Sequence, residues 1–161
     1  MDNIVAWNIR GLNWPNKQAD LRTFLHTNKI GMIGLMQTKI KVENDSKIAA
    51  RAFPRWKWEN NSTLQIKGRI WIAWHPKMYE LQVLHKTDQI MHCYAIQMTT
   101  HKKFYITFVY GINHDHQRQS MWKNLLAISQ HMNDAWCIIR DSNVVLYKED
   151  RRGKMRYRAK R

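Results

Sequence analysis

The amino-acid sequence predicts one mixed α/β (α+β) domain with a largely antiparallel sheet. The chain has 161 residues, 44% of them hydrophobic, which is enough for one buried core. Its first third alternates strand-like and helix-like segments, and residues 56–110 hold apolar runs separated by short polar turns. The sequence shows no internal repeat, and no low-complexity segment precedes its basic end. Residues 1–150 are therefore expected to form a single domain.

The first third of the sequence predicts a strand, a helix, a second strand and a second helix. Residues 3–9 form a short apolar run, and Asn16 is the candidate cap for a helix over residues 16–28. Residues 30–36 form another apolar run, which ends at the polar triplet 37–39. A second helix is predicted before Pro54 from the apolar spacing of Ile48, Ala49 and Ala52.

Beyond residue 55 the pattern changes to short strands. The short turns between these strand-like runs favour an antiparallel meander. A helix over residues 115–132 follows, with His114-Asp115 as its candidate cap, and residues 136–139 form a last strand that leads to Asp141. The runs of the meander are residues 56–60, 69–74, 80–85, 90–99 and 104–110.

Polar residues follow four of the predicted strands, at positions where a rigid scaffold presents chemistry. They are Asn8, Gln37, Tyr110, and Asp141 with Asn143. Each also has an ordinary structural interpretation. Asn8 suits a turn, Tyr110 continues an apolar face and suits the core, and Asp141 with Asn143 suits a loop or cap. The adjacent His114 and Asp115 are typical of a helix start, and we assign no metal to them.

The context of these residues resembles the four ordered motifs of endonuclease/exonuclease/phosphatase domains. Asn8 takes the place of the metal-site Asn in the first motif, and Gln37, Tyr110 and Asp141 fall in the second, third and fourth. The matching segments are residues 4–12, 34–39, 108–111 and 138–143. Residues 7–13 and 147–153 further resemble plant LINE-type retrotransposon reading frames, in which this domain precedes a reverse transcriptase. The resemblance covers roughly residues 1–153.

The resemblance implies Mg²⁺-dependent cleavage of DNA phosphodiesters, which needs an oriented water and neutralisation of the developing charge. In this family a carboxylate in the second motif holds Mg²⁺, and the Asn of the first motif supports that site. By the same resemblance Asp141 would position the attacking water, while Asn143 and Tyr110 would contact the phosphate. A downstream Asp-His pair completes the family's active site.

The sequence departs from the family pattern in ways that predict impaired catalysis. Gln37 stands where the family has Glu, and a neutral amide gives Mg²⁺ less reason to shed its water. Arg140 and Ser142 replace the Gly and Phe that flank the fourth-motif Asp, so Arg140 is positioned to displace the loop or to pair with Asp141. No His follows Asp141, so the downstream Asp-His pair is missing.

The fold implied by the resemblance is a partial DNase I-like β-sandwich flanked by helices, with its second sheet incomplete. One sheet is expected to be nearly complete and the other to lack strands, which would leave an apolar sheet face exposed. Self-association, or a protein partner over that face, is the expected consequence.

The net charge of +15 favours DNA as a partner through non-specific electrostatic contacts. Residues 151–161 form a basic tail, expected to be disordered, and residues 1–150 keep a charge of +8 without it. The abrupt rise in charge beyond Gly153 is also typical of a sequence that runs past the end of homology. The candidate nucleic-acid-binding residues of the tail are Arg151, Arg152, Lys154, Arg156 and Arg158.

Both cysteines, Cys93 and Cys137, lie in apolar runs and are expected to be buried free thiols. This fits a reducing compartment, and no apolar run reaches the length of a membrane span. The sequence therefore predicts an intracellular protein of the nucleus or cytoplasm. The predicted function is that of a degenerate retrotransposon endonuclease domain. The alternatives are a non-enzymatic protein that binds nucleic acid or a partner, and a relic without a selected role.

The basic tail generates a first test. Deleting residues 154–161 removes five Lys and Arg side chains and should weaken binding to duplex DNA. The dependence of log K on log salt should become shallower, by up to about 0.9 for each phosphate that the deleted side chains neutralise. Fluorescence anisotropy at several salt concentrations measures this slope. Binding that ignores salt would contradict the electrostatic interpretation.

Overall fold

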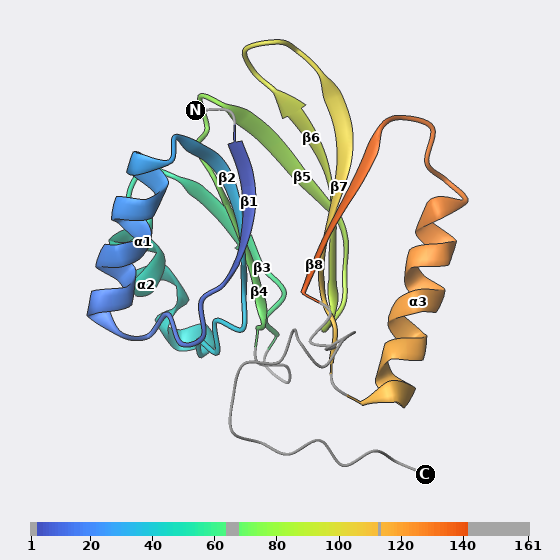
Figure 1. The fold of residues 1–161 in the computed structure, drawn as a ribbon, viewed down its shortest axis with the longest axis horizontal. Coiled ribbons are helices and arrows are strands. Elements are labelled where there is room, and N and C mark those ends of the chain that lie inside the picture. The colour runs from blue at the N-terminus through green and yellow to red at the C-terminus, as the bar shows by residue number, and fades with distance from the viewer. Residues whose placement is uncertain (1–2, 64–67, 113, 142–161) are drawn as a thin grey trace, which may run out of the picture.

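The computed structural model describes residues 3–63, 68–112 and 114–141 of the chain. These residues form two four-stranded sheets and three α-helices. The sheets pack face to face, with α1 and α2 outside the first sheet and α3 outside the second (Figure 1). The order of the layers is therefore helix, sheet, sheet, helix.

The first sheet has the strand order β1-β2-β4-β3. Strand β1 (Asn3–Asn8) runs parallel to β2 (Ile30–Met36), and the other pairs are antiparallel. Strands β3 (Lys57–Asn60) and β4 (Ile70–Trp74) complete the sheet. Its outer face is covered by α1 (Pro15–Thr27) and α2 (Asp45–Ala52), and the short 3-10 helix η1 (Val42–Asn44) leads into α2.

The second sheet has the order β5-β6-β7-β8. Strands β5 (Tyr79–Lys86), β6 (Ile90–Gln97) and β7 (Lys103–Tyr110) form an antiparallel meander. Helix α3 (Asp115–Ser129) then returns the chain so that β8 (Trp136–Asp141) lies parallel to β7. Each sheet therefore contains one parallel pair, β1 with β2 and β7 with β8.

Successive side chains of β2 point to opposite faces of the first sheet, and they show how the layers pack. Ile33 and Leu35 face the helices, whereas Met32 and Met36 face the second sheet. All seven residues of β2 are buried, because both faces of this strand are covered. A third and smaller cluster joins α3 to the outer face of the second sheet through Ile90, Val109, Met121 and Leu125.

The partial sandwich predicted from the sequence is confirmed, and the distribution of strands differs from the expectation. The meander expected over residues 56–110 is divided, because β3 and β4 join the first sheet while β5, β6 and β7 form the second. The turn between β4 and β5 carries the chain from one sheet to the other. The inner faces cover each other at the central strands, whereas Ala6 of β1 and Cys137 of β8, which point to the inner side, are exposed. The uncovered apolar face expected from the sequence is therefore present only in part among the described residues.

Three local expectations also need correction. The N-cap of α1 is Trp14 and not Asn16, because Pro15 already occupies the first helical turn. Helix α3 ends at Ser129, short of the expected residue 132. Cys93 is buried as predicted, and burial raises the pKa of its thiol to about 12, but Cys137 is exposed on the outermost described strand.

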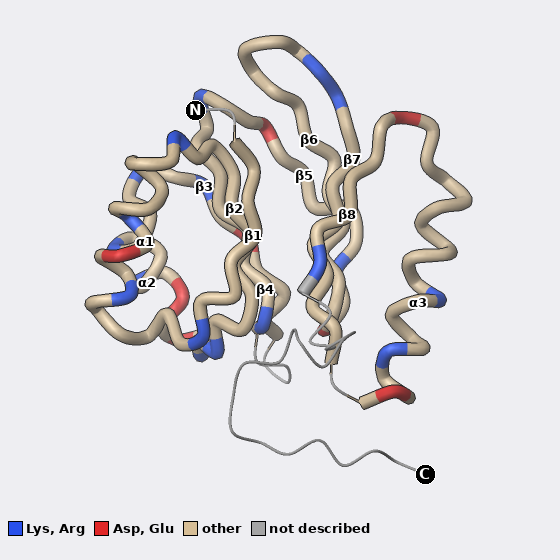
Figure 2. Tube along the Cα trace, in the orientation of Figure 1, with Lys and Arg blue, Asp and Glu red and all other residues tan. Residues whose placement is uncertain are grey.

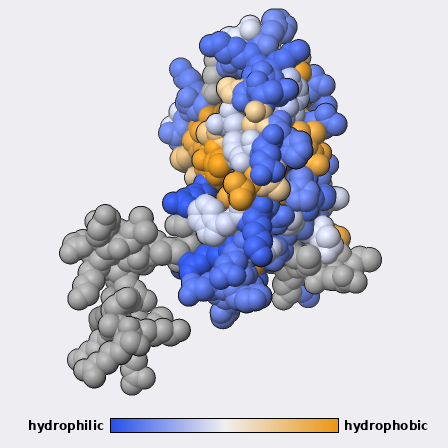
Figure 3. Space-filling model, turned by 90° about the vertical axis from the view of Figure 1, so that its right-hand side faces the viewer, coloured by the Kyte–Doolittle hydropathy of each residue, from blue (hydrophilic) through white to orange (hydrophobic). Residues whose placement is uncertain are grey.

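Exposed apolar residues gather on α3 and β8. Trp122, Leu126 and Ile138 are 50%, 63% and 43% exposed. Figure 3 shows this side of the molecule, where an orange apolar area lies among hydrophilic atoms. Self-association, or a protein partner over an exposed sheet face, stays a prediction. None of the helices in the described residues is long and apolar enough to cross a membrane.

The two sheets approach each other closely where Gly34 of β2 meets Phe108 of β7. A Cβ atom added to Gly34 would overlap the phenyl ring of Phe108, which is fully buried. The position therefore has no room for a side chain. Phe108 fills the space that every other residue type at position 34 would occupy.

We predict that Gly34→Ala lowers the free energy of unfolding by about 1–3 kcal/mol, because an overpacked core must shift. Without the ring, the same change would stabilise a strand slightly. Urea unfolding of Gly34→Ala, Phe108→Leu and the double variant measures the coupling, and the penalty should shrink in the Phe108→Leu background. A Gly34→Ala protein more stable than wild type would contradict the close packing.

Candidate functional site

The ends of four strands converge at one edge of the sandwich. Asn8 ends β1 opposite Met36 of β2, so Gln37 follows directly beside it. Tyr110 ends β7 opposite Asp141 of β8 in the second sheet. Each pair is parallel, so its two strands end on the same side of their own sheet. The hydrogen bond between Gln37 and Tyr110 shows that the two pairs of ends meet at one edge of the sandwich. The structure thus brings together four of the five strand-end residues singled out from the sequence.

The backbone of Gln37 is held in the left-handed region, with φ of 56°. Its N–H donates to the carbonyl of Arg69 at 2.8 Å, and its own carbonyl accepts from the N–H of Gly11 at 3.3 Å. A left-handed non-glycine residue is uncommon and persists where surrounding contacts fix it. The two backbone bonds therefore direct the Gln37 side chain toward the second sheet.

The Gln37 amide links the two sheets. Its Nε2 donates to the Tyr110 hydroxyl at 2.9 Å, and its Oε1 accepts from Nε of Arg10 at 3.1 Å. The Tyr110 ring is buried in the core between the sheets, and the guanidinium of Arg69 lies 5.5 Å from its centre. We call the bonded set Arg10, Gln37 and Tyr110 the strand-end chain.

The loop after β1 places Arg10 in this chain. Arg10 and Gly11 both have positive φ, 37° and 86°, which turns the backbone sharply after Ile9. Lys17 of α1 fixes the turn, because its Nζ donates to the carbonyl oxygens of Ile9 and Arg10 at 2.9 and 2.8 Å. A hollow of about 240 Å³ lies beside the turn, between Asn8, Arg10, Lys17 and Asp20.

The described residues of this site do not fit a divalent cation. Mg²⁺ requires hard oxygen ligands, usually with negative charge. Gln37 contributes a neutral amide whose oxygen already faces the Arg10 cation. Nowhere in the described part of the chain do three or more His, Cys, Asp or Glu side chains come close enough to hold a metal. The arrangement offers an anion two arginines, Arg10 and Arg69, more readily than it offers a cation its ligands.

Several candidate residues lie beyond what the structure describes. The backbone of Asp141 is described as the last residue of β8, whereas Asn143 and the tail residues Arg151, Arg152, Lys154, Arg156 and Arg158 lie outside the described residues. Their proposed roles remain predictions. The sequence predicts that Arg140 displaces the loop or pairs with Asp141; in the structure its guanidinium lies 5.6 Å from the ring centre of Trp122 on α3.

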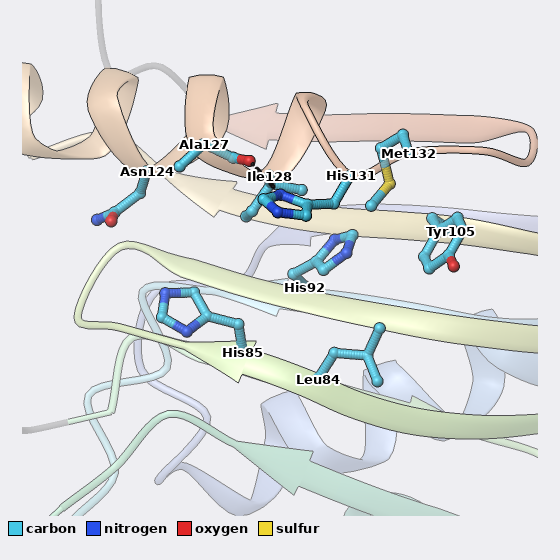
Figure 4. Close-up of a pocket in the computed structure, with 9 residues that line it drawn as sticks. All are labelled: Leu84, His85, His92, Tyr105, Asn124, Ala127, Ile128, His131 and Met132. Carbon is cyan, nitrogen blue, oxygen red and sulfur yellow. Dashed lines mark hydrogen bonds between the residues drawn. The ribbon is translucent and has the colours of Figure 1, made fainter.

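A second hollow, of about 450 Å³, lies between α3 and the outer face of the second sheet (Figure 4). His85, His92 and His131 line it together with apolar side chains. His92 is buried and stacks on Tyr105, with the ring planes 9° apart. Its Nδ1 lies 2.8 Å from the Thr107 hydroxyl, which also accepts from the indole N–H of Trp136. Burial lowers the pKa of His92, and the neighbouring His85 lowers it further.

No protein-family model and no curated protein matches the chain. Solved structures do match. A Bacteroides thetaiotaomicron endonuclease/exonuclease/phosphatase family protein has a TM-score of 0.67 at 9% identity, covering 91% of this chain and 65% of its own. The chain has the endonuclease/exonuclease/phosphatase fold.

Two further solved structures, both of proteins that act on or bind DNA by their names, also match. The endonuclease domain of TRAS1, a telomere-specific non-LTR retrotransposon, has a TM-score of 0.67 at 12% identity, covering 88% of this chain and 61% of its own. Danio rerio TDP2, complexed with single-strand DNA product, has a TM-score of 0.64 at 16% identity, covering 88% and 60%. The present chain spans 60–65% of the length of these three structures. At such identities the likeness shows the fold.

The sequence did not reveal Arg10 and Arg69 as members of the site. Arg10 stands inside the first motif, two residues after Asn8, and this was the available signal. Its bond to Gln37 depends on the left-handed turns at both residues, which alternation of apolar residues does not encode.

The buried imidazole generates a pH prediction. In the unfolded chain His92 takes up a proton near pH 6.5, whereas the folded chain resists this because its pKa is lowered. The free energy of unfolding should therefore fall as pH drops below 6.5, by at most about 1.4 kcal/mol per pH unit for this group.

Urea unfolding between about pH 8 and pH 5 measures this dependence. The variant His92→Gln should have a shallower fall than wild type. His116→Gln, at an exposed position on α3, is the matched control and should leave it unchanged. Equal slopes in all three proteins would contradict a neutral buried His92.

Proposed function

We propose that this chain is a degenerate retrotransposon endonuclease domain that binds nucleic-acid phosphates and has lost Mg²⁺-dependent cleavage. The observation that carries the proposal is the strand-end chain, in which Arg10 is hydrogen-bonded to Gln37 at the position where the resemblance places a metal-binding carboxylate. Motif resemblance to LINE-type reading frames supports the retrotransposon origin, and the fold shared with the TRAS1 endonuclease domain agrees with it.

Loss of cleavage follows from charge. A carboxylate at position 37 would attract Mg²⁺, whereas the amide carries no net charge and its oxygen is occupied by a guanidinium N–H. A cation approaching Oε1 meets a positive charge that is already in place. In this proposal Asp141 and Asn143 have no metal-bound phosphate on which to act.

Retained binding also follows from charge. Arg10, Lys39, Lys41 and Arg69 lie on the loops at the strand-end edge, and Figure 2 shows Lys and Arg segments gathered at the lower end of the first sheet and its helices. Glu43, a nearby acid, is itself paired with Lys41 at 3.9 Å. Phosphate oxygens would be the natural partners of this edge.

The alternative is that cleavage survives. The fold family includes enzymes, and the candidate groups Asp141 and Asn143 are present in the sequence. Direct assay separates the two functions, since binding and cleavage respond differently to metal removal.

We predict that the purified protein does not nick supercoiled plasmid in Mg²⁺ above background, while it still binds DNA when a chelator has removed divalent metal. Gel analysis of plasmid forms measures nicking, and fluorescence anisotropy measures binding. Metal-dependent nicking that Asp141→Ala abolishes would refute the proposal.

The same assays apply to Gln37→Glu. The new carboxylate should form an ion pair with Arg10 and remain inactive, because the pair neutralises the ligand before a metal arrives. The matched variant is Gln37→Glu with Arg10→Gln, in which no guanidinium competes for the carboxylate. Calorimetric titration with Mg²⁺ should detect binding only in this double variant. Restored nicking by Gln37→Glu alone would show that Arg10 does not block the site.

A further inference from the structure

Trp14 stands out because an indole is usually buried, at least in part. It is 66% exposed, more than any other large hydrophobic side chain of the described residues, whereas Trp71 and Trp74 are buried in the cores. Trp14 is the N-cap residue of α1, where Ser, Thr, Asp or Asn is favoured, and its side chain makes no capping bond. Neither core packing nor capping therefore explains the residue.

The segment that carries Trp14 is tied to the strand-end chain. The indole lies alongside Gly11, whose added Cβ would be 3.7 Å from Cδ1 of Trp14. The N–H of Gly11 donates to the carbonyl of Gln37, and Nδ2 of Asn13 donates to the carbonyl of Lys39 at 3.3 Å. Gly11 thus connects the two residues, because the Trp14 indole lies beside it and its N–H is hydrogen-bonded to Gln37.

The same segment is held from the helix side. Lys17 donates to the carbonyls of Ile9 and Arg10, and Nε2 of Gln18 donates to the carbonyl of Leu12 at 3.0 Å. Gln18 is itself buried. Because these bonds fix the backbone from residue 9 to residue 14, the backbone positions that carry the Arg10 and Trp14 side chains are constant relative to each other. A ligand would find the cation and the aromatic face already arranged.

Arg10 and Trp14 together match the two parts of a nucleotide. A guanidinium has five N–H donors, and Arg10 directs Nε at Gln37. An exposed indole stacks on any base, because every base has a flat aromatic face. In a duplex both faces of each base are covered by its neighbours, so stacking on a side chain requires an unpaired base.

We infer that Trp14 is a stacking platform for an unpaired base of single-stranded DNA whose phosphate contacts Arg10. This inference rests on the proposed function and names its ligand class. The site therefore binds single-stranded DNA more tightly than duplex, because Trp14 stacks only on an unpaired base. The basic residues attract the phosphates of both forms.

The test compares a fluorescein-labelled thymidine oligonucleotide with a duplex of equal length by fluorescence anisotropy. Trp14→Ala weakens single-strand binding by about 5- to 100-fold, since base stacking on an aromatic residue has that effect. Duplex affinity stays within about twofold of wild type, because phosphate contacts do not involve the indole. Trp14→Phe retains most of the single-strand affinity, because the phenyl ring still stacks.

Two further variants make the result specific. Trp122→Ala removes another exposed Trp, on α3 at the far side of the second sheet, and leaves both affinities unchanged. Arg10→Gln weakens both DNA forms. Circular dichroism and thermal unfolding confirm that each variant is folded.

The outcomes separate the two proposals. If wild type binds both DNA forms and Trp14→Ala changes neither, or weakens both equally, the stacking platform is overturned and phosphate binding stands. If wild type binds neither form at low salt, the proposed function fails and the platform falls with it. Loss of single-strand affinity in Trp122→Ala would also overturn the assignment to Trp14.

Discussion

The arrangement of the whole site depends on how closely the two sheets pack. Phe108 fills the space above Gly34, and this contact brings β2 and β7 together in the middle of the core. Because the strands continue from there to a common edge, Gln37 and Tyr110 come within hydrogen-bond distance of each other. A bulkier residue at position 34 would separate the sheets and break the polar link several residues away. Core packing therefore sets the geometry of the chemistry.

The strand-end edge shows how one neutral side chain changes the character of a site. An amide can donate and accept at once, so Gln37 bonds Tyr110 with its nitrogen and Arg10 with its oxygen. A carboxylate has no donor, so it could keep both partners only by accepting from each of them, with the Tyr110 hydroxyl as the donor. Gln37 therefore suits a site that is closed by internal hydrogen bonds and positive at its rim, whereas a Glu would suit a site that binds a metal ion.

Much of the fold could be predicted from the sequence, because apolar runs and polar turns mark its strands. The strand end at Tyr110 was predicted correctly, and the first strand, expected over residues 3–9, ends one residue earlier at Asn8. The transfer of the chain between sheets after Trp74 was not predicted, since its turn resembles a hairpin turn. The bond between Arg10 and Gln37 was also missed. It depends on the positive φ of both residues, and the spacing of apolar residues in a sequence does not indicate a positive φ. Such long-range pairs emerge only once both loops are placed against each other.

The division of the sandwich into two consecutive parts of the chain bears on how it assembles. Residues 3–74 supply the first sheet with α1 and α2, and residues 79–141 supply the second with α3. Each part pairs its strands only among themselves, so its sheet can form before the parts dock, while the core between the sheets forms only on docking. Until then each part exposes one apolar face that its counterpart on another copy fits equally well. Exchange of halves between copies is therefore an inherent competitor of correct folding at high concentration.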